Sequence, residues 1–445
     1  MIGVYCMGES RSIRKNFWLF ALPSMLGQLL NSLFIIVDGF FIGQNLGDPG
    51  LAAINVAWPL VAMVQAVSMM VGTGGAVQLA IDVGREDLRS ALRARNHAVF
   101  MLVCAAVLLG SGLFLTYPVI LPLLGANEVL YPLTADYIRV VCICAACQVF
   151  TTGVMPLLRG AGRTIAAMSL TILGLVGNIF LDWLFIQHFD WGMQGVALAT
   201  AMSQGVCGFL GLGLLLSRKR WYLKSEPFRP DFRQMGRILG LGFPTFGLTI
   251  STSVLILLNN LQALRYGDTE GVAVYAVLSY TLGSVIPLVS GVGDGIQPLL
   301  GNAYGAKRRD DILKLRHMGV SLAVGTALLC SAGVMTFRKG LPLIFGASPS
   351  AAAEVAGAVW TLALAFPFMA AVRFYCSYFC ALGQSRDSSL LAYCEPLAAQ
   401  PFFLLLLPLV WKLEGVWMSY PAAMMTMAAL AAVLLRRHRA GLISE

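Results

Sequence analysis

Four polar side chains lie inside long apolar stretches of the sequence, where they would form a cation site. Asp38 lies in IIVDGFF, Asp182 in GNIFLDW and Thr200 in ALATAMS, and Asn178 precedes Asp182 by one helical turn on the same face. A charge at the centre of a bilayer costs about 2.5–3.5 kcal/mol even on lenient scales, so such residues indicate function. Their oxygen atoms suit a hard cation such as Na⁺. Two neighbouring carboxylates would also share a proton, so the pattern leaves Na⁺ and H⁺ open.

The composition places these residues in a membrane protein. Of 445 residues, 58% are hydrophobic and only 12% are charged, against about 25% charged in soluble domains. This balance excludes an ordinary soluble enzyme. At about 20–25 residues per spanning helix, the apolar residues suffice for roughly a dozen spans, with little left for a domain outside the membrane.

Apolar stretches separated by turn or charge signals predict the spans. We expect an all-α integral membrane protein with twelve transmembrane helices at 17–45, 52–80, 96–116, 133–157, 164–189, 192–216, 237–264, 271–300, 317–338, 353–381, 388–411 and 415–435. Asp38, Asp182 and Thr200 then each lie about seven or eight residues, or roughly 10–12 Å, from the outer end of a span. The cation site is therefore expected at one depth.

The lysines and arginines predict the orientation. Most of the 31 fall in the two tails and in connections that follow even-numbered helices, Arg159 and Arg163 among them, whereas connections after odd-numbered helices hold only Arg265, Arg338, Lys339 and Lys412. By the positive-inside rule both termini are cytoplasmic. The net charge of +9 is explained by this asymmetry and by contact with anionic lipid headgroups, so we expect a multi-pass protein of the cell (plasma or inner) membrane and no nucleic-acid partner.

Short patterns recur along the chain at an offset of about 220 residues. Gly72, Gly74 and Gln78 of VGTGGAVQ reappear in GVGDGIQ at 291–297, and Pro23 of the first span returns as Pro244 of the seventh. This spacing covers an even number of helices, so the two six-helix halves share one orientation. We expect an N-lobe at 1–216, a cytoplasmic linker at 217–236 and a C-lobe at 237–445.

Two parallel bundles around a central cleft are typical of a secondary transporter, in which rocking of the halves exposes the cleft to alternate sides of the membrane. The repeat also compares the two halves directly. At this offset Asp38 corresponds to Asn259, Asp182 to Phe402 or Phe403, and Thr200 to Tyr420 or Pro421. The second half lacks the acids, so we expect cation coupling in the N-lobe.

Arg373 and Glu395 flank a turn near Gln384 at similar distances and would meet on adjacent antiparallel helices. We predict a buried ion pair. The pair has two alternative roles: it either stabilises the fold or lines the cleft, where Glu395 would attract cationic substrates.

One short motif offers weak support for an enzymatic function. Gly291-Val292-Gly293-Asp294 spells the GxGD element of intramembrane aspartyl proteases, but the second catalytic aspartate is missing, because the seventh span ends Leu-Asn-Asn-Leu-Gln. We therefore expect no enzyme, no catalytic residue, no cofactor, and no metal beyond Na⁺ at the four polar residues.

The chain resembles the multidrug and toxic-compound extrusion (MATE) family over essentially its whole length. The resemblance rests on twelve spans in two parallel halves, the GNIxLD segment with Asn178 and Asp182, Thr200 beyond Gly195-Val196, and GIQPLLGNAYGAK at 295–307. It implies that Asp38, Asn178, Asp182 and Thr200 form the cation site of the N-lobe, with the Val196 carbonyl as a further ligand and Tyr137 as a neighbour. It also implies that the first helix bends at Pro23.

The resemblance further implies a cation-coupled antiporter, driven by Na⁺ or H⁺, that exports organic cations and other drugs by alternating access. We expect amphipathic or cationic small-molecule substrates and a monomer in the bilayer. One departure from the family is that the seventh helix near Thr252 carries no acid. The alternative is a flippase for a lipid-linked saccharide, which predicts a cleft lined with arginine and lysine, whereas only Arg373 and Arg139 are available.

Overall fold

The computed structural model describes residues 13–217, 228–340 and 349–444, and these residues contain no β-strand. Half of the expected linker, residues 218–227, lies outside the described residues. The first half contains α1 (Ile13–Gly84), α2 (Leu88–Leu123), α3 (Leu130–Ile143), α4 (Ala145–Gly160), α5 (Thr164–Asp182), the π-helix η2 (Trp183–His188) and α6 (Gly192–Leu216). The second contains α7 (Phe232–Gly305), α8 (Arg309–Thr336), α10 (Pro349–Ala381), α11 (Ser385–Cys394), the π-helix η4 (Glu395–Ala399), α12 (Gln400–Leu406) and α13 (Pro408–Ser444).

The predicted twelve-span arrangement is confirmed. The described helices include eleven that are long and apolar enough to cross a membrane, and a twelfth when α3 and α4 count as one bent span. α1 and α7 each join two spans, because a residue with positive φ turns the chain at Gly47 (φ 62°) and at Asp268 (φ 51°).

The fourth expected span, at 133–157, differs from a straight helix. α3 and α4 meet at Cys144 with a bend of 62°. Cys144 leaves the helical conformation with ψ near 17°. A Cβ atom on Gly110 of α2 would lie 2.9 Å from the carbonyl oxygen of Cys142, so a glycine lets α2 pass close to the bend.

The internal repeat is visible in the backbone turns as well as in the sequence. Positive-φ residues at Gly47, Glu86 and Gly162 correspond to Asp268, Lys307 and Gly383, each about 221 positions later. The same turn geometry therefore ends corresponding helices in both halves, as expected for two copies of one six-helix unit.

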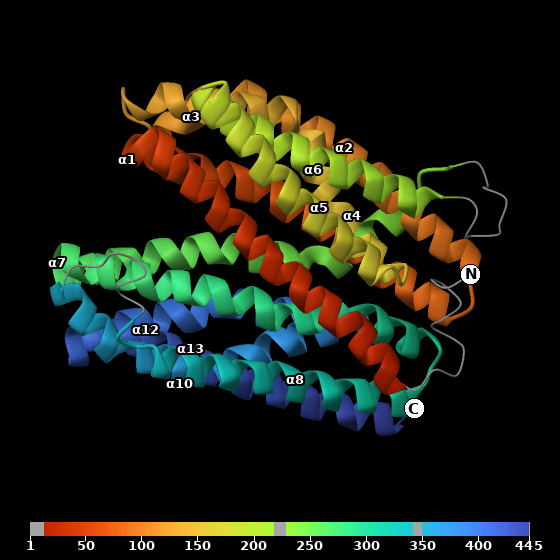
Figure 1. Cartoon of the computed structure of the whole chain (residues 1–445). Helices are drawn as coiled ribbons and strands as arrows, with labels where there is room; N and C mark the ends of the chain where they lie inside the picture. Colours follow the sequence, from red (N-terminus) through yellow and green to blue (C-terminus); the bar gives the residue numbers. More distant parts are fainter. Residues whose placement is uncertain (1–12, 218–227, 341–348, 445) are drawn as a thin grey trace.

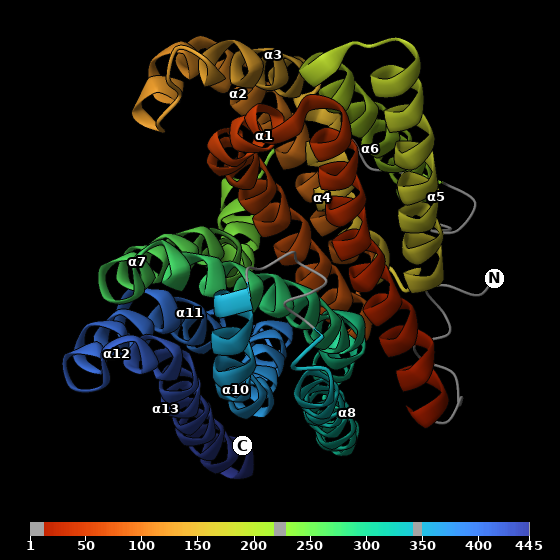
Figure 2. The ribbon, with the colours of Figure 1, turned by 60° about the vertical axis from the view of Figure 1, so that its left-hand side comes forward.

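The helices form two bundles that meet at one face of the molecule. Figure 1 shows the bundles close together at the face where α1 begins and α13 ends, which we call the terminal face, and their ribbons diverging toward the opposite face. Figure 2 shows the same division, with α2 to α6 in one bundle and α8 to α13 in the other.

The beginning of α1 packs in the core of the second bundle, and the beginning of α7 packs in the core of the first. Phe17 and Phe20 of α1 are 1% and 6% exposed and pack in the core of the second bundle. Ile238 of α7 is 0% exposed and packs in the core of the first. The two first helices therefore join the bundles near the terminal face.

Glycines make the contact between the bundles unusually close. A Cβ atom on Gly74 would overlap the carbonyl oxygen of Ile238, and one on Gly242 would overlap that of Met70. Gly84 approaches the carbonyl of Asn302 in the same way, and Gly305 that of Ile81. Small residues let membrane helices approach backbone to backbone.

Outside the spans, Asp87 marks the start of α2. Its carboxylate accepts hydrogen bonds from the backbone N–H of Ser90 at 3.0 Å and from the Ser90 hydroxyl at 2.7 Å. These bonds stabilise the charged form, so the pKa of Asp87 lies below its ordinary value. Capping of this kind satisfies a free N–H group at the helix start.

Candidate functional site

The structure brings the polar residues of the first half together in one site. Asp38 of α1 accepts a hydrogen bond from the hydroxyl of Thr200 of α6 at 3.4 Å. Asp182, at the end of α5, lies close enough to Asp38 for their charges to interact. Tyr137 of α3 is 7% exposed and lies within the field of both carboxylates. Four separate helices thus converge on one small polar site.

Asn178 and Asp182 lack partners in this site. Both side chains are 0% exposed, and neither their carboxylate oxygens nor their amide atoms form a hydrogen bond with any described residue. Burying an unpaired charge costs several kcal/mol, so a carboxylate in this position requires a proton or a bound cation. The donor set is all oxygen, apart from the amide nitrogen, and therefore fits either one.

The local backbone presents these residues through a widened helix. α5 ends at Asp182 and continues directly as the π-helix η2. π-helical turns are rare and are frequent at functional sites, because they shift the following side chains around the helix axis. Val196 of α6 is 0% exposed and lies one helical turn before Thr200, on the same face.

The corresponding region of the second half is polar but uncharged. The Gln400 amide donates to the Asn259 side-chain oxygen at 3.5 Å and to the Ser419 hydroxyl at 3.3 Å. All three residues are at most 7% exposed. The second half therefore contains an amide and hydroxyl cluster on three helices, in place of the acids, and no strong cation site is expected there.

Arg373 and Glu395 also meet. Arg373 Nη2 of α10 lies 3.3 Å from Glu395 Oε1, and the two side chains are only 9% and 2% exposed. Glu395 begins the second π-helix, η4. Such deep burial inside the second bundle favours a structural role over a lining of the cleft.

We expect Glu395→Gln to destabilise the protein, because it leaves the Arg373 charge buried without a counter-charge. Removing one partner of a buried ion pair typically costs about 3–5 kcal/mol. The measurement is the thermal unfolding temperature of the purified protein in detergent. The control is Asp136→Asn, which removes the acid of a pair whose side chains are 53% and 36% exposed and should change little. An unchanged unfolding temperature for Glu395→Gln would contradict the importance of the pair.

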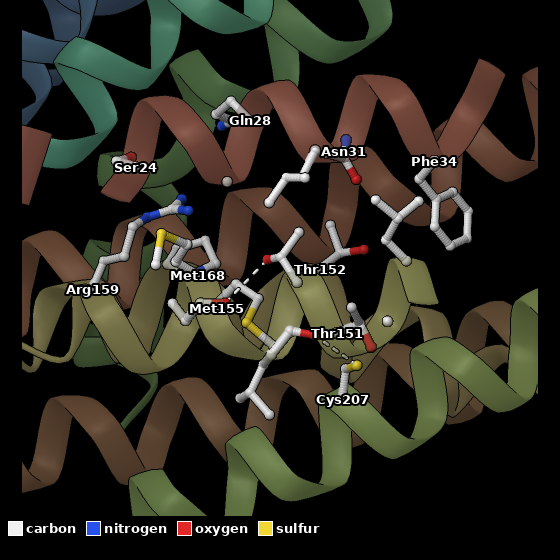
Figure 3. A pocket seen from close by; sticks show the side chains of 18 of the residues that line it. Ser24, Gln28, Asn31, Phe34, Thr151, Thr152, Met155, Arg159, Met168 and Cys207 are labelled. Carbon is white, nitrogen blue, oxygen red and sulfur yellow. Dashed lines mark hydrogen bonds between the residues drawn. The ribbon is translucent and has the colours of Figure 1, made fainter. Parts of the chain in front are cut away.

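A second feature of the first bundle is a cavity of about 260 Å³ between α1, α4, α5 and α6, to which α7 contributes Thr249. Pro23 of α1 lines it, as do Gln28, Asn31 and Arg159. Figure 3 shows the Arg159 side chain extending from α4 toward α1, where Ser24 and Gln28 lie. Sequence reasoning missed this residue by counting it with the cytoplasmic connection, whereas it lies in the last turn of α4.

Asp294 links the two halves beside this cavity. Its carboxylate accepts a hydrogen bond from the Gln28 amide at 2.8 Å, which joins α7 to α1. Asp294 belongs to the GxGD element that supported the protease alternative. This contact gives it a simpler role, which is to join the two bundles.

Two bundles of membrane-spanning helices, with buried carboxylates in one of them and close contact at one face, define a membrane transporter. The chain matches the MatE family model over residues 23–184 and 244–396. The chain belongs to the multidrug and toxic-compound extrusion (MATE) family.

Similar proteins agree with this assignment along the whole chain. Multidrug export protein MepA of Staphylococcus saprophyticus is 25% identical over 440 residues, which cover 96% of this chain and 94% of the relative. MepA of Staphylococcus aureus (strain NCTC 8325 / PS 47) is 23% identical with the same coverage.

A solved structure, described as an outward-facing conformation of a multidrug resistance MATE family transporter, superimposes with a TM-score of 0.94 at 22% identity, over 100% of this chain and 99% of the other. A MATE structure in complex with MaL6 gives 0.93 at 23% identity, over 100% of both chains. At these identities the structural likeness concerns the fold.

Proposed function

We propose that the protein is a cation-coupled antiporter that exports amphipathic or cationic small molecules across the cell membrane by alternating access. The observation that carries this proposal is the buried carboxylate of Asp182, which has no hydrogen-bond partner among the described residues and lies beside Asp38. A group of this kind binds a proton or Na⁺ favourably. The relatives named multidrug export proteins support small-molecule drugs as the cargo.

In this proposal the first lobe, 1–216, carries the coupling site. This lobe moves against the second lobe, 237–445. Asp38, Asn178, Asp182 and Thr200 hold Na⁺ or H⁺, with the Val196 carbonyl as a further ligand and Tyr137 closing the site. Pro23 is the hinge of α1, because proline removes one helical hydrogen bond and allows bending there.

Both termini are cytoplasmic, and the linker 217–236 lies on the same side. The glycine contacts at the terminal face then close the molecule toward the cytoplasm, while the other face opens outward. One cation entering down 100 mV releases about 2.3 kcal/mol, enough for roughly a 40- to 50-fold substrate gradient at one-to-one exchange. No cofactor is required, and a monomer suffices because both lobes belong to one chain.

The flippase alternative requires several basic side chains around a pyrophosphate. Arg159 is the only charged residue that lines the cavity of the first bundle. Arg373 is paired with Glu395, and Arg139 donates a hydrogen bond to the Tyr117 hydroxyl at 2.9 Å. The chemistry of the described residues therefore favours drug export.

The test is transport by the purified protein in vesicles loaded with a fluorescent organic cation. An inward Na⁺ gradient and an inward pH gradient are imposed separately, with protein-free vesicles as the control. We expect efflux under one of them at a rate at least about ten times that without a gradient. Equal efflux with and without both gradients would overturn antiport.

A further inference from the structure

The cavity of the first bundle has a polarity that the proposed export of cations does not explain. Its lining residues are neutral except for Arg159. Uncharged polar groups line it from several helices, among them Gln28 and Asn31 of α1 and Thr152 of α4, and Met155 and Met168 supply an adaptable apolar surface. An organic cation placed here would be repelled by the guanidinium, because charges interact strongly where water is scarce.

Arg159 also lacks a direct partner. No described residue forms a hydrogen bond or an ion pair with its guanidinium within the usual distances. Charged side chains inside a membrane normally pair with one another or with backbone carbonyls, so an unpaired arginine that faces a cavity indicates a missing ligand.

The nearest acid does not fill this role. Asp294 of α7 interacts with Arg159 electrostatically but forms no ion pair with it, and its carboxylate instead accepts the hydrogen bond from Gln28. The hydroxyl of Ser24, 3% exposed, likewise has no hydrogen-bond partner among the described residues. Figure 3 shows the Arg159 side chain directed toward the part of α1 that carries Ser24 and Gln28. Two groups able to donate hydrogen bonds thus lie at one end of a mainly apolar chamber.

We propose that this cavity binds amphipathic molecules through a carboxylate group, and that Arg159 is the residue that binds it. The substrates it selects are organic acids or zwitterions with one acidic group and a compact apolar body. A guanidinium offers two parallel N–H groups that match a carboxylate, and the charged hydrogen bonds formed are about twice as strong as neutral ones. The inference rests on the proposed export of amphipathic molecules and names their class.

The test compares three fluorescent probes with the same naphthalene body: dansylglycine, its methyl ester, and a dansyl amide that carries a trimethylammonium group. Binding is measured at equilibrium on the purified full-length protein in nanodiscs of phosphatidylcholine. We expect wild-type protein to bind the acid at least about 10-fold more tightly than the ester, and the ammonium probe most weakly, because a hydrogen bond to a charged group is worth about 1.5–3 kcal/mol.

Arg159→Gln should lower the affinity for dansylglycine by about 10- to 150-fold and leave the ester unchanged. Arg159→Lys keeps the charge but loses the planar pair of N–H groups. Its affinity for dansylglycine should therefore lie between those of the wild type and Arg159→Gln. The matched control is Arg163→Gln, since Arg163 lies four residues further along the chain, in the connection before α5 and outside the cavity lining, and donates instead to the Leu214 carbonyl. It should not change the ranking of the three probes.

Two results would overturn the proposal, and a third would assign the site to a lipid instead. One is equal affinity of wild-type protein for acid and ester, which needs no variant and therefore decides the matter even if Arg159→Gln fails to fold. The other is an equal loss of affinity for all three probes in Arg159→Gln, which is expected if Arg159 only stabilises the fold next to Asp294. A lipid phosphate is distinguished by nanodiscs with phosphatidylglycerol: an unchanged affinity for the acid supports the proposal, and a clear loss assigns the site to the lipid. Because no ion gradient is present, failure of antiport in vesicles would not affect these results.

Discussion

Replacing Asp182 with asparagine is expected to abolish ion-driven efflux while the protein still folds. The carboxylate is buried without a hydrogen-bond partner among the described residues, so only a bound cation or proton stabilises its charge. Asparagine has nearly the same shape but neither binds a cation strongly nor carries a proton. The substrate gradient sustained by vesicles should fall from about 40- to 50-fold to about unity. The unfolding temperature should stay the same or rise, because a buried charge has been removed.

The matched control for this change is Asp87→Asn. It is the same chemical substitution at an exposed position between two spans, and asparagine caps a helix as well as aspartate does. Efflux should therefore remain at the wild-type level. Asp38→Asn should reproduce the loss seen for Asp182→Asn, because the two acids lie close together. Full gradient-driven efflux in Asp182→Asn would remove the coupling role of the site.

The second large effect is expected from Gly242→Ala at the contact between the bundles. The added methyl group would overlap the backbone carbonyl of Met70, and a backbone atom inside a packed helix cannot move aside as a side chain can. The contact at the terminal face should therefore fail to close. We expect efflux to fall at least about 10-fold, and amide hydrogen exchange in the first turns of α7 to become faster by mass spectrometry.

Gly240→Ala is the control for this experiment. Gly240 lies two residues earlier on the same helix, and a Cβ atom there would meet no atom within 4 Å. Alanine favours a helix over glycine by up to about 1 kcal/mol, so this variant should be as stable as the wild type or slightly more so. If both alanine variants transported equally well, close approach of the backbones would not be needed for the transport cycle.

The spans were predictable because a helix that crosses lipid needs a long apolar stretch, and such stretches, bounded by charged residues, are visible in the sequence. The bend between α3 and α4 was not, because Cys144 is neither proline nor glycine, the usual signals of a kink. The place of Arg159 was also missed. It precedes Gly160 at the end of a helix and resembles the basic residues of a connection, although its side chain enters a cavity.

The proximity of Asp38, Asp182 and Thr200 was predictable because each is a polar residue in an apolar stretch and was expected near 10–12 Å from the outer end of a span. The amide cluster of the second half was not predicted, although its member Asn259 was identified as the counterpart of Asp38. The constant offset placed the counterpart of Asp182 at Phe402 or Phe403, whereas the residue that contacts Asn259 is Gln400. The π-helices begin at different points of the two repeats, at Trp183 and Glu395, so a fixed offset does not preserve which side chain faces inward.

The packing of the beginnings of α1 and α7 in the opposite bundles also constrains how the chain assembles after synthesis. The core that contains Ile238 is incomplete until the seventh span has entered the membrane, although the six preceding spans are already present. Phe17 and Phe20, which are made first, must wait for α7 to α13 before their packing partners exist. The nascent first half is therefore exposed on one side during translation, and its final packing is completed only when the second half arrives.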